Sequence, residues 1–149
     1  MVFHSQGRLD EAIQQYRLAL SLKPDNIKTL NNLALLLESQ GKLDEAVSYY
    51  RRAVQIEPDF FEANYNIGCV LSSQGRLEEA DDYLHQALRL VPTDANVHYE
   101  MAVVLERKGK PDEAIGHIRQ ALKIKPNHSQ SLQKLAEIQA ARPAREPHR

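Results

Sequence analysis

The side chains best suited to chemistry are a single cysteine, Cys69, and six histidines. A cysteine nucleophile needs a base beside it, and the helical pattern described below brings no histidine next to Cys69. His85 and His117 lie nearly one repeat apart, and no cluster of His, Cys, Asp and Glu has the spacing of a metal site. We therefore expect no catalytic residue, no metal, no cofactor and no enzymatic activity.

Two further pairs of side chains suit recognition rather than catalysis. Asn32 and Asn66 lie 34 residues apart, and so do Tyr65 and Tyr99. A side-chain amide offers donors and an acceptor to a peptide backbone, and a tyrosine offers a flat amphipathic surface. Their common spacing implies a regular structure that repeats every 34 residues and places each pair on one surface.

A period of 34 residues runs through the whole chain. It is followed by Gly7, Gly41, Gly75 and Gly109, by Pro24, Pro58, Pro92 and Pro126, and by Ala12, Ala46, Ala80 and Ala114. A fixed period of this length is typical of stacked repeats, in which each unit buries the apolar face of its neighbour. The chain is therefore interpreted as one repeat array.

Each unit of the array has the pattern of two helices. The first has apolar residues at i, i+3, i+4 and i+7, which form one helix face: Leu30, Leu33, Ala34 and Leu37. A turn that contains Gly41 ends this helix, since glycine accepts the backbone conformation of a C-cap. The second helix has two acidic residues in its first turn and ends before a proline.

This pattern resembles that of the tetratricopeptide repeat family over nearly the whole chain. In residues 27–60 the matching motif positions are Leu30, Leu33, Ala34, Leu37, Gly41, Ala46, Tyr50, Ala53 and Pro58. The first aromatic of the family motif is absent, because the chain has no Trp. The resemblance implies an all-α fold, a right-handed superhelical α-solenoid of antiparallel helix pairs with about three and a half repeats and a C-terminal capping helix.

The period also divides the chain into segments. The array spans residues 1–141, with a partial repeat at 1–26, repeats at 27–60, 61–94 and 95–128, and a capping helix at 129–141. Gly7 falls at the turn position of the partial repeat. Residues 142–149 contain two prolines and no apolar periodicity, so we expect a disordered, mildly basic tail.

In this family the first helices line a concave groove that holds an extended peptide or a partner helix. The resemblance therefore implies a non-enzymatic scaffold for protein–protein interaction. Its groove positions in this chain are Lys28, Asn31, Asn32, Leu35, Glu62, Tyr65, Asn66, Cys69, Asn96, Tyr99, Glu100, Val103 and Arg107.

The charge of the groove narrows the class of partner. Its basic positions are Lys28 and Arg107, and the acidic side chains on the same face are Glu38, Glu62, Glu100 and Glu106. We therefore expect a neutral to basic peptide, and no nucleic acid, which needs a basic stripe. No apolar run approaches the roughly 18 residues of a membrane span, and no secretory signal begins the sequence. These features predict no membrane association and a cytoplasmic location.

A second class of function stays open, in which the repeats recruit substrates for a larger enzyme. The repeats of O-linked N-acetylglucosamine transferase carry an asparagine ladder along their groove. Asn32 and Asn66 match that ladder, whereas Glu100 and Lys134 depart from it. A catalytic domain in the same reading frame would decide between the two classes.

The N-terminal end indicates self-association. Counted back along the period, Met1 falls within a first helix, so that most of the helix expected to cover residues 9–22 would be missing. Apolar surface would then face water at Tyr16, Ala19 and Leu20, and a second copy of the chain would cover it. We therefore expect a homo-oligomer formed through this end, or an excised piece of a longer array.

Overall fold

Amphipathic segments separated by glycine and proline fold into helices joined by short turns. The computed structural model describes residues 2–142, which form eight helices and no strand. The helices are α1 Val2–Leu22, α2 Ile27–Ser39, α3 Leu43–Ile56, α4 Phe61–Ser73, α5 Leu77–Leu90, α6 Ala95–Arg107, α7 Pro111–Ile124 and α8 Ser129–Ala141. The all-α class predicted from the sequence is confirmed.

The predicted glycine turns end α2, α4 and α6. Gly41, Gly75 and Gly109 have positive φ angles of 76°, 76° and 77°. After α2, the backbone N–H of Lys42 donates to the carbonyl oxygen of Leu37 at 2.9 Å, the bond that closes a Schellman-type C-cap. Glycine supplies the left-handed conformation at these turns without a steric penalty, and each turn reverses the chain into the second helix of the pair.

Gly7 departs from this pattern, because α1 continues through it without a turn. The turn predicted at this position is therefore wrong. The turns after α2, α4 and α6 are each held by extensive packing between the two helices that they join. At Gly7 a continuous helix adds one backbone hydrogen bond for each residue, and this local gain decides the conformation.

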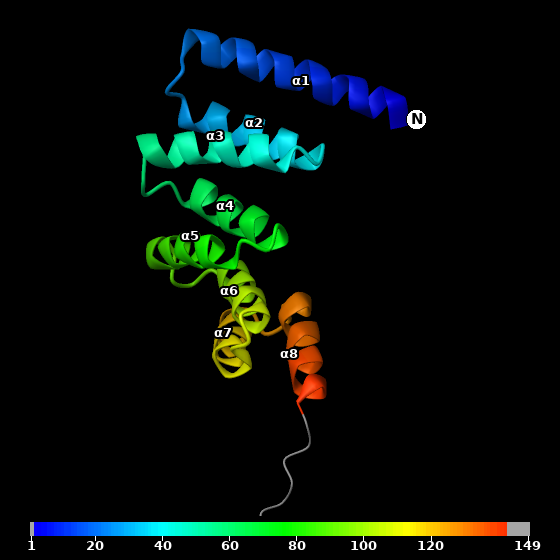
Figure 1. Ribbon diagram of the computed structural model, residues 1–149, viewed down its shortest axis with the longest axis vertical. Coiled ribbons are helices and arrows are strands. Elements are labelled where there is room, and N and C mark those ends of the chain that lie inside the picture. The colour runs from blue at the N-terminus through cyan, green and yellow to red at the C-terminus, as the bar shows by residue number, and fades with distance from the viewer. Residues whose placement is uncertain (1, 143–149) are drawn as a thin grey trace, which may run out of the picture.

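The helices stack into an elongated solenoid (Figure 1). The most extensive contacts join α2 to α3, α4 to α5 and α6 to α7, and each pair also packs against the next. In addition α4 contacts α6, and α6 contacts α8, so first helices of successive pairs lie side by side. Within residues 2–142, no helix is long and apolar enough to cross a membrane.

Small residues set how closely the two helices of a pair approach. The alanines at the predicted contact positions are fully buried: Ala46, Ala53, Ala80 and Ala87. A Cβ placed on Gly68 would lie 2.6 Å from Cγ of Leu84, so the surface of α4 leaves no room there for a methyl group. This close packing holds α4, and the groove residues on it, at a fixed distance from α5.

Candidate functional site

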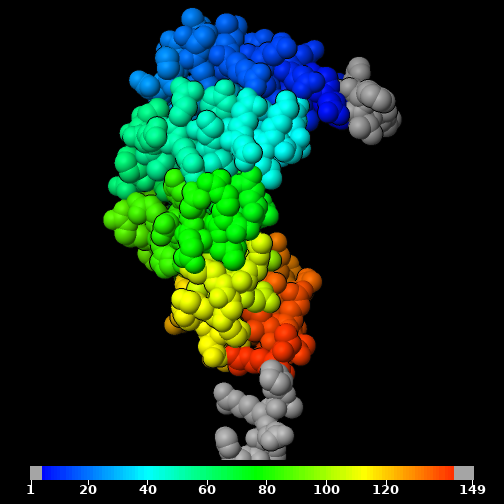
Figure 2. Space-filling view, viewed as in Figure 1, coloured from blue at the N-terminus to red at the C-terminus, as the bar shows by residue number. Residues whose placement is uncertain are grey.

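The predicted groove residues lie on α2, α4 and α6, which hydrogen bonds join into one face. Asn66 on α4 donates from Nδ2 to Oδ1 of Asn31 on α2, at 3.3 Å. The guanidinium of Arg107 on α6 donates to the carbonyl oxygen of Ser72 on α4. In Figure 2 the outline of the molecule is hollowed beside α4, between α1 and α8. These first helices therefore form a continuous surface, which we call the concave face.

Residues 35 apart are neighbours across this face, as both hydrogen bonds show. Because the units repeat regularly, the same offset relates Tyr65 to Glu100 and Tyr99 to Lys134, and the charged residue of each pair acts electrostatically on its tyrosine. We call these pairs rungs: Asn31–Asn66, Tyr65–Glu100 and Tyr99–Lys134. The sequence predicts that Asn32 and Asn66 bind successive amides of a peptide, and within the chain Asn66 also bonds to Asn31. The stacking of the solenoid shifts successive units relative to one another. A residue therefore meets the position 35 residues further along, rather than the equivalent position 34 residues away.

Electrostatic effects agree with this arrangement of the rungs. Burial raises the pKa of the Tyr65 phenol, and Cys69 and Glu100 raise it further. Burial also raises the pKa of Tyr99, Glu100 adds to the increase, and Lys134 opposes it. The charge of Glu100 therefore acts on both tyrosines, one on its own helix and one on α4.

Glu100 is a half-buried carboxylate without a partner. Burial alone raises the pKa of its carboxyl group above the ordinary range. Among the described residues, none donates a hydrogen bond to Glu100 or forms an ion pair with it. The centre of the concave face thus carries a partly desolvated negative charge that the protein itself does not neutralise.

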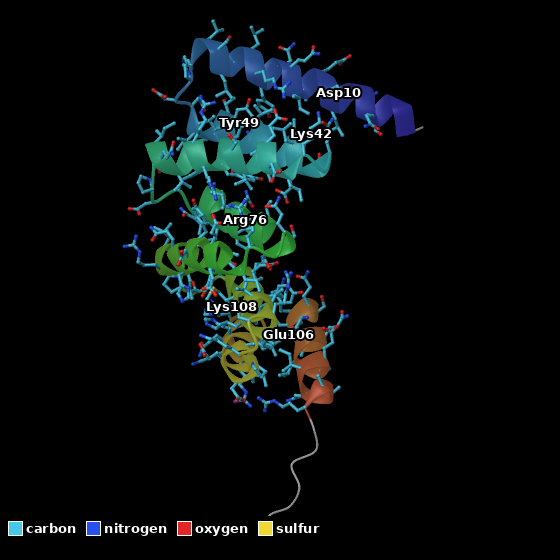
Figure 3. All side chains as sticks on the ribbon, viewed as in Figure 1. Asp10, Lys42, Tyr49, Arg76, Glu106 and Lys108 are labelled. Atoms are coloured by element: carbon cyan, nitrogen blue, oxygen red, sulfur yellow. The ribbon has the colours of Figure 1, made fainter. Side chains whose placement is uncertain are left out.

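In the next rung, Tyr99–Lys134, the charge of the lysine is neutralised within the chain. The Lys134 ammonium lies 3.0 Å from a carboxylate oxygen of Glu106 and 3.0 Å from one of Glu137. Figure 3 shows Glu106 at the boundary between α6 and α8, where this ion pair joins the two helices. Lys134 was noted in the sequence only as a break in an asparagine ladder, and its carboxylate partners were not predicted.

The groove end near α8 is organised by His128, which the sequence analysis missed. This side chain is 6% exposed, and its Nε2 lies 2.9 Å from Oδ1 of Asn96. Its Nδ1 lies 2.7 Å from Oγ of Ser131, and its ring lies 5.8 Å from that of Tyr99. Asn96 and Tyr99 are therefore partly engaged within the chain. His128 occupies the N-cap position of α8, and that position was the signal available in the sequence.

The other predicted groove residues differ in accessibility. Lys28, Asn32 and Glu62 are exposed, and Leu35 is 42% exposed. Val103 is half-buried. The part of the concave face formed by α2 and the start of α4 is therefore the most open to a ligand.

Cys69 is placed among groups that suppress its reactivity. Burial raises the pKa of its thiol, and the negative charge of Glu100 raises it further. A thiol held in its neutral form is a poor nucleophile. Among the side chains of residues 5–142, no group of three or more His, Cys, Asp or Glu is arranged to hold a metal ion. Cys69 therefore contributes shape to the groove.

Two histidines meet on the other side of α6. Nδ1 of His98 lies 3.0 Å from Nδ1 of His117, and Nε2 of His98 lies 3.0 Å from the carbonyl oxygen of Pro92. A carbonyl only accepts, so His98 donates from Nε2, and a neutral His98 accepts at Nδ1 from His117. His98 is 8% exposed and belongs to the buried side of α6. The pair joins α6 to α7.

The outer face has its own hollow, but its charges are paired. It measures about 470 Å³ and lies between α3 and the start of α5, with Arg51, Arg52 and Arg76 in its lining. Arg51 and Arg76 both bond to Glu79, and Arg52 donates to the carbonyl oxygen of Pro24 at 3.3 Å. All three arginines of this hollow are thus engaged within the chain, two of them with the one carboxylate of Glu79.

The residues predicted for self-association lie in different environments. Leu20 is 7% exposed and belongs to the core, so its predicted exposure is wrong. Packing of α1 against α2 covers it. Tyr16 is half-buried against the same core, and Ala19 is exposed. The large apolar residues exposed on α1 are instead Leu18, at 58%, and Leu22, at 78%.

Beyond α8, the predicted basic tail lies outside the described residues except for Arg142. This arginine donates to a carboxylate oxygen of Asp112 on α7. On α8 itself, Leu132 is 49% exposed, whereas Ile138 is buried in a small cluster with residues of α6 and α7. One side of the last helix thus packs on the array, and the other faces water.

Comparison with protein-family models gives one consistent result. A model described as TPR repeat matches residues 2–41. Models described as tetratricopeptide repeat match residues 27–60, 49–82 and 71–138. Together these matches span residues 2–138. Among curated protein sequences, no relative matches this chain.

Solved structures with the same architecture include MamA, YrrB and an O-GlcNAc transferase. MamA is 25% identical over 92% of this chain and 80% of its own, with a TM-score of 0.85. YrrB, described as a TPR protein with an unusual peptide-binding site, is 24% identical over 91% and 70%, with a TM-score of 0.80. The Thermobaculum terrenum O-GlcNAc transferase mutant K341M is 27% identical over 75% of this chain but 22% of its own, with a TM-score of 0.72.

Proposed function

The chain belongs to the tetratricopeptide repeat family, whose arrays serve as protein-interaction scaffolds, and we propose that its concave face binds a peptide segment of a partner protein. The segment is extended or helical and neutral to basic. Tyr65, Tyr99, Asn32 and Asn66 contribute contacts to it.

One contrast between the two faces of the array carries this proposal. On the outer face, charged side chains bridge successive units, with Arg17 2.5 Å from Glu45 and Arg51 2.7 Å from Glu79. On the concave face, Glu100 has no partner among the described residues, and Asn32 is exposed. Polar groups that the fold leaves unpaired on one concave surface are available to a ligand.

The binding test uses an array of immobilised 12-residue peptides of random sequence. Asn32→Ala combined with Asn66→Ala should weaken binding of the peptides that the wild-type chain retains by roughly tenfold, since each lost hydrogen bond costs about 1 kcal/mol. Asn127→Ala is the matched control, because Asn127 is exposed in the turn after α7. Unchanged retention by the double variant would show that the groove assignment is wrong.

The alternative function is substrate recruitment within a larger glycosyltransferase. The similarity to the O-GlcNAc transferase supports it, although that match spans 22% of the transferase chain. In this chain Glu100 and Lys134 stand where the asparagine ladder would continue. A catalytic domain encoded in the same reading frame would establish this alternative, and its absence there would exclude it.

Self-association through the N-terminal end is a separate proposal. Leu18 and Leu22 lie one helical turn apart on α1 and are mostly exposed, with Ala19 beside them. A second copy that covers them would bury apolar area. Leu18→Glu combined with Leu22→Lys should convert an associated species to a monomer in sedimentation velocity. A wild-type chain that remains monomeric at tens of micromolar would refute the proposal.

A further inference from the structure

We propose that the Tyr65–Glu100 rung is a subsite for one lysine or arginine side chain of the bound peptide. The inference rests on the proposed function, because it assigns the chemistry of one position within the same groove. It adds a defined anchor to a binding surface that is otherwise polar and nearly neutral.

The position of the rung supports a specific contact rather than a diffuse charge effect. The rung joins α4 to α6, and these helices contact each other directly. The offset of 35 residues that defines it is seen in the hydrogen bond between Asn31 and Asn66 and in that between Ser72 and Arg107. The bond between Arg107 and Ser72 fixes α4 relative to α6 before any ligand binds, and the bond between Asn31 and Asn66 fixes α2 relative to α4. This order in the free protein lowers the entropic cost of binding.

The missing partner of Glu100 is a cation. The basic side chains of the neighbouring first helices are already engaged, Arg107 with the Ser72 carbonyl oxygen and Lys134 with Glu106 and Glu137. A carboxylate that has lost part of its water without gaining a partner is destabilised, and the raised pKa of Glu100 is consistent with this. An ammonium or guanidinium group from a ligand would supply the missing interaction.

The two tyrosines make the subsite selective for an organic cation. Glu100 acts electrostatically on the phenols of both Tyr65 and Tyr99, which lie on the neighbouring helices α4 and α6 of the same face. Aromatic rings attract ammonium and guanidinium groups, and they also cover the aliphatic stem of Lys or Arg. A single carboxylate flanked by tyrosines lacks the several oxygen ligands that a metal ion requires.

The experiment compares which peptides are retained by wild-type protein, Glu100→Gln and Glu57→Gln. Random 12-residue peptides with acetylated and amidated ends are used, so that no terminal charge contributes. Glu100→Gln preserves shape and removes the charge, and Glu57→Gln removes an equal charge from an exposed position at the end of α3. Wild type and Glu57→Gln should enrich Lys and Arg at one peptide position by about tenfold, and Glu100→Gln should lose that enrichment.

The outcomes separate the subsite from the groove as a whole. Glu100→Gln that still retains peptides, without the preference for Lys and Arg, supports both proposals. Equal enrichment in wild type and Glu100→Gln overturns the subsite and leaves groove binding intact. A wild-type chain that retains no peptide overturns the proposed function itself. Glu100→Lys provides a second check, because it should shift the enrichment to Asp and Glu, and circular dichroism confirms that each variant is folded.

Discussion

The two tyrosine rungs of the concave face share an offset of 35 residues and have opposite electrostatic character. In the Tyr65–Glu100 rung the charged residue has no partner and burial raises its pKa. In the Tyr99–Lys134 rung the charged residue lies 3.0 Å from each of two carboxylates. Both rungs have a tyrosine and an offset of 35 residues. They differ in whether the chain supplies a partner for the charged residue.

This difference indicates which rung has a structural role and which has a role in binding. Lys134 joins α8 to α6 through Glu106, so its ion pairs help attach the last helix to the array. Glu100 forms no hydrogen bond or ion pair with another helix in the part of the chain that the structure describes. A charge that costs folding free energy and stabilises no contact is typical of a residue that acts on a ligand, since binding sites are where proteins tolerate such costs.

The largest effect on stability is expected from disturbing the contact between α4 and α5, the helix pair that carries Tyr65 of the Tyr65–Glu100 rung. Ala80 is fully buried where α5 meets α4, and Ala80→Leu should lower the free energy of unfolding by about 1 to 3 kcal/mol through overpacking. Ala95→Leu, at the half-buried start of α6, should change it by less than about 0.5 kcal/mol. Thermal unfolding followed by circular dichroism distinguishes the two variants, and equal melting temperatures would contradict the assigned helix contact.

A smaller effect, on peptide binding, is expected from making the Tyr99–Lys134 rung resemble the Tyr65–Glu100 rung. Lys134→Gln removes the cation shared by Glu106 and Glu137, and so leaves two carboxylates near Tyr99 without an ion pair. Retention of peptides rich in Lys and Arg should then increase by roughly threefold, as expected for one partly screened charge. Lys123→Gln is the control, because Lys123 is exposed in the last turn of α7. If both variants behave alike, pairing within the chain is not what distinguishes the rungs.

The sequence predicted the repeat architecture because the determinants are local and periodic. Gly41 and Ala46 act within one helix pair, so the 34-residue period carries their positions directly. Gly7 shows the limit of this reasoning, since the same residue at the same period lies inside a continuous helix. The turn depends on packing between the two helices that it joins, and the periodicity of single residues does not report that packing.

The site was less predictable, because it depends on contacts between units. The sequence identified most residues of the rungs, but the 34-residue period does not report the offset of 35 residues at which Asn31 meets Asn66. The partners of Lys134 and the position of His128 also depend on the stacking of α6 and α8. The exposure predicted for Leu20 is wrong because this residue packs against the following unit, a contact that the 34-residue period does not report.

The smallest predicted effect is a difference in pH dependence between the two rungs. Burial raises the pKa of Glu100 above the value expected in the unfolded chain, so ionisation is disfavoured in the native state. The stability associated with the neutral form is present below the unfolded pKa and is lost as pH rises through the folded pKa. Glu137 behaves in the opposite way, because its hydrogen bonds with Lys134 and Gln133 lower its pKa, and its contribution is lost as pH falls.

Glu100→Gln should therefore unfold at a higher temperature than the wild-type chain at pH 7, by roughly 1 to 3 °C once solvent screening is considered. The advantage should disappear below about pH 4, where an unperturbed glutamate is protonated in both states. Glu137→Gln should show the reverse order at pH 7, with a melting temperature at or slightly below that of the wild type. Melting curves of the three proteins between pH 3 and pH 8 test this directly. A lower melting temperature for Glu100→Gln at pH 7 would show that Glu100 has a stabilising partner within the chain, and the distinction between the two rungs would then fail.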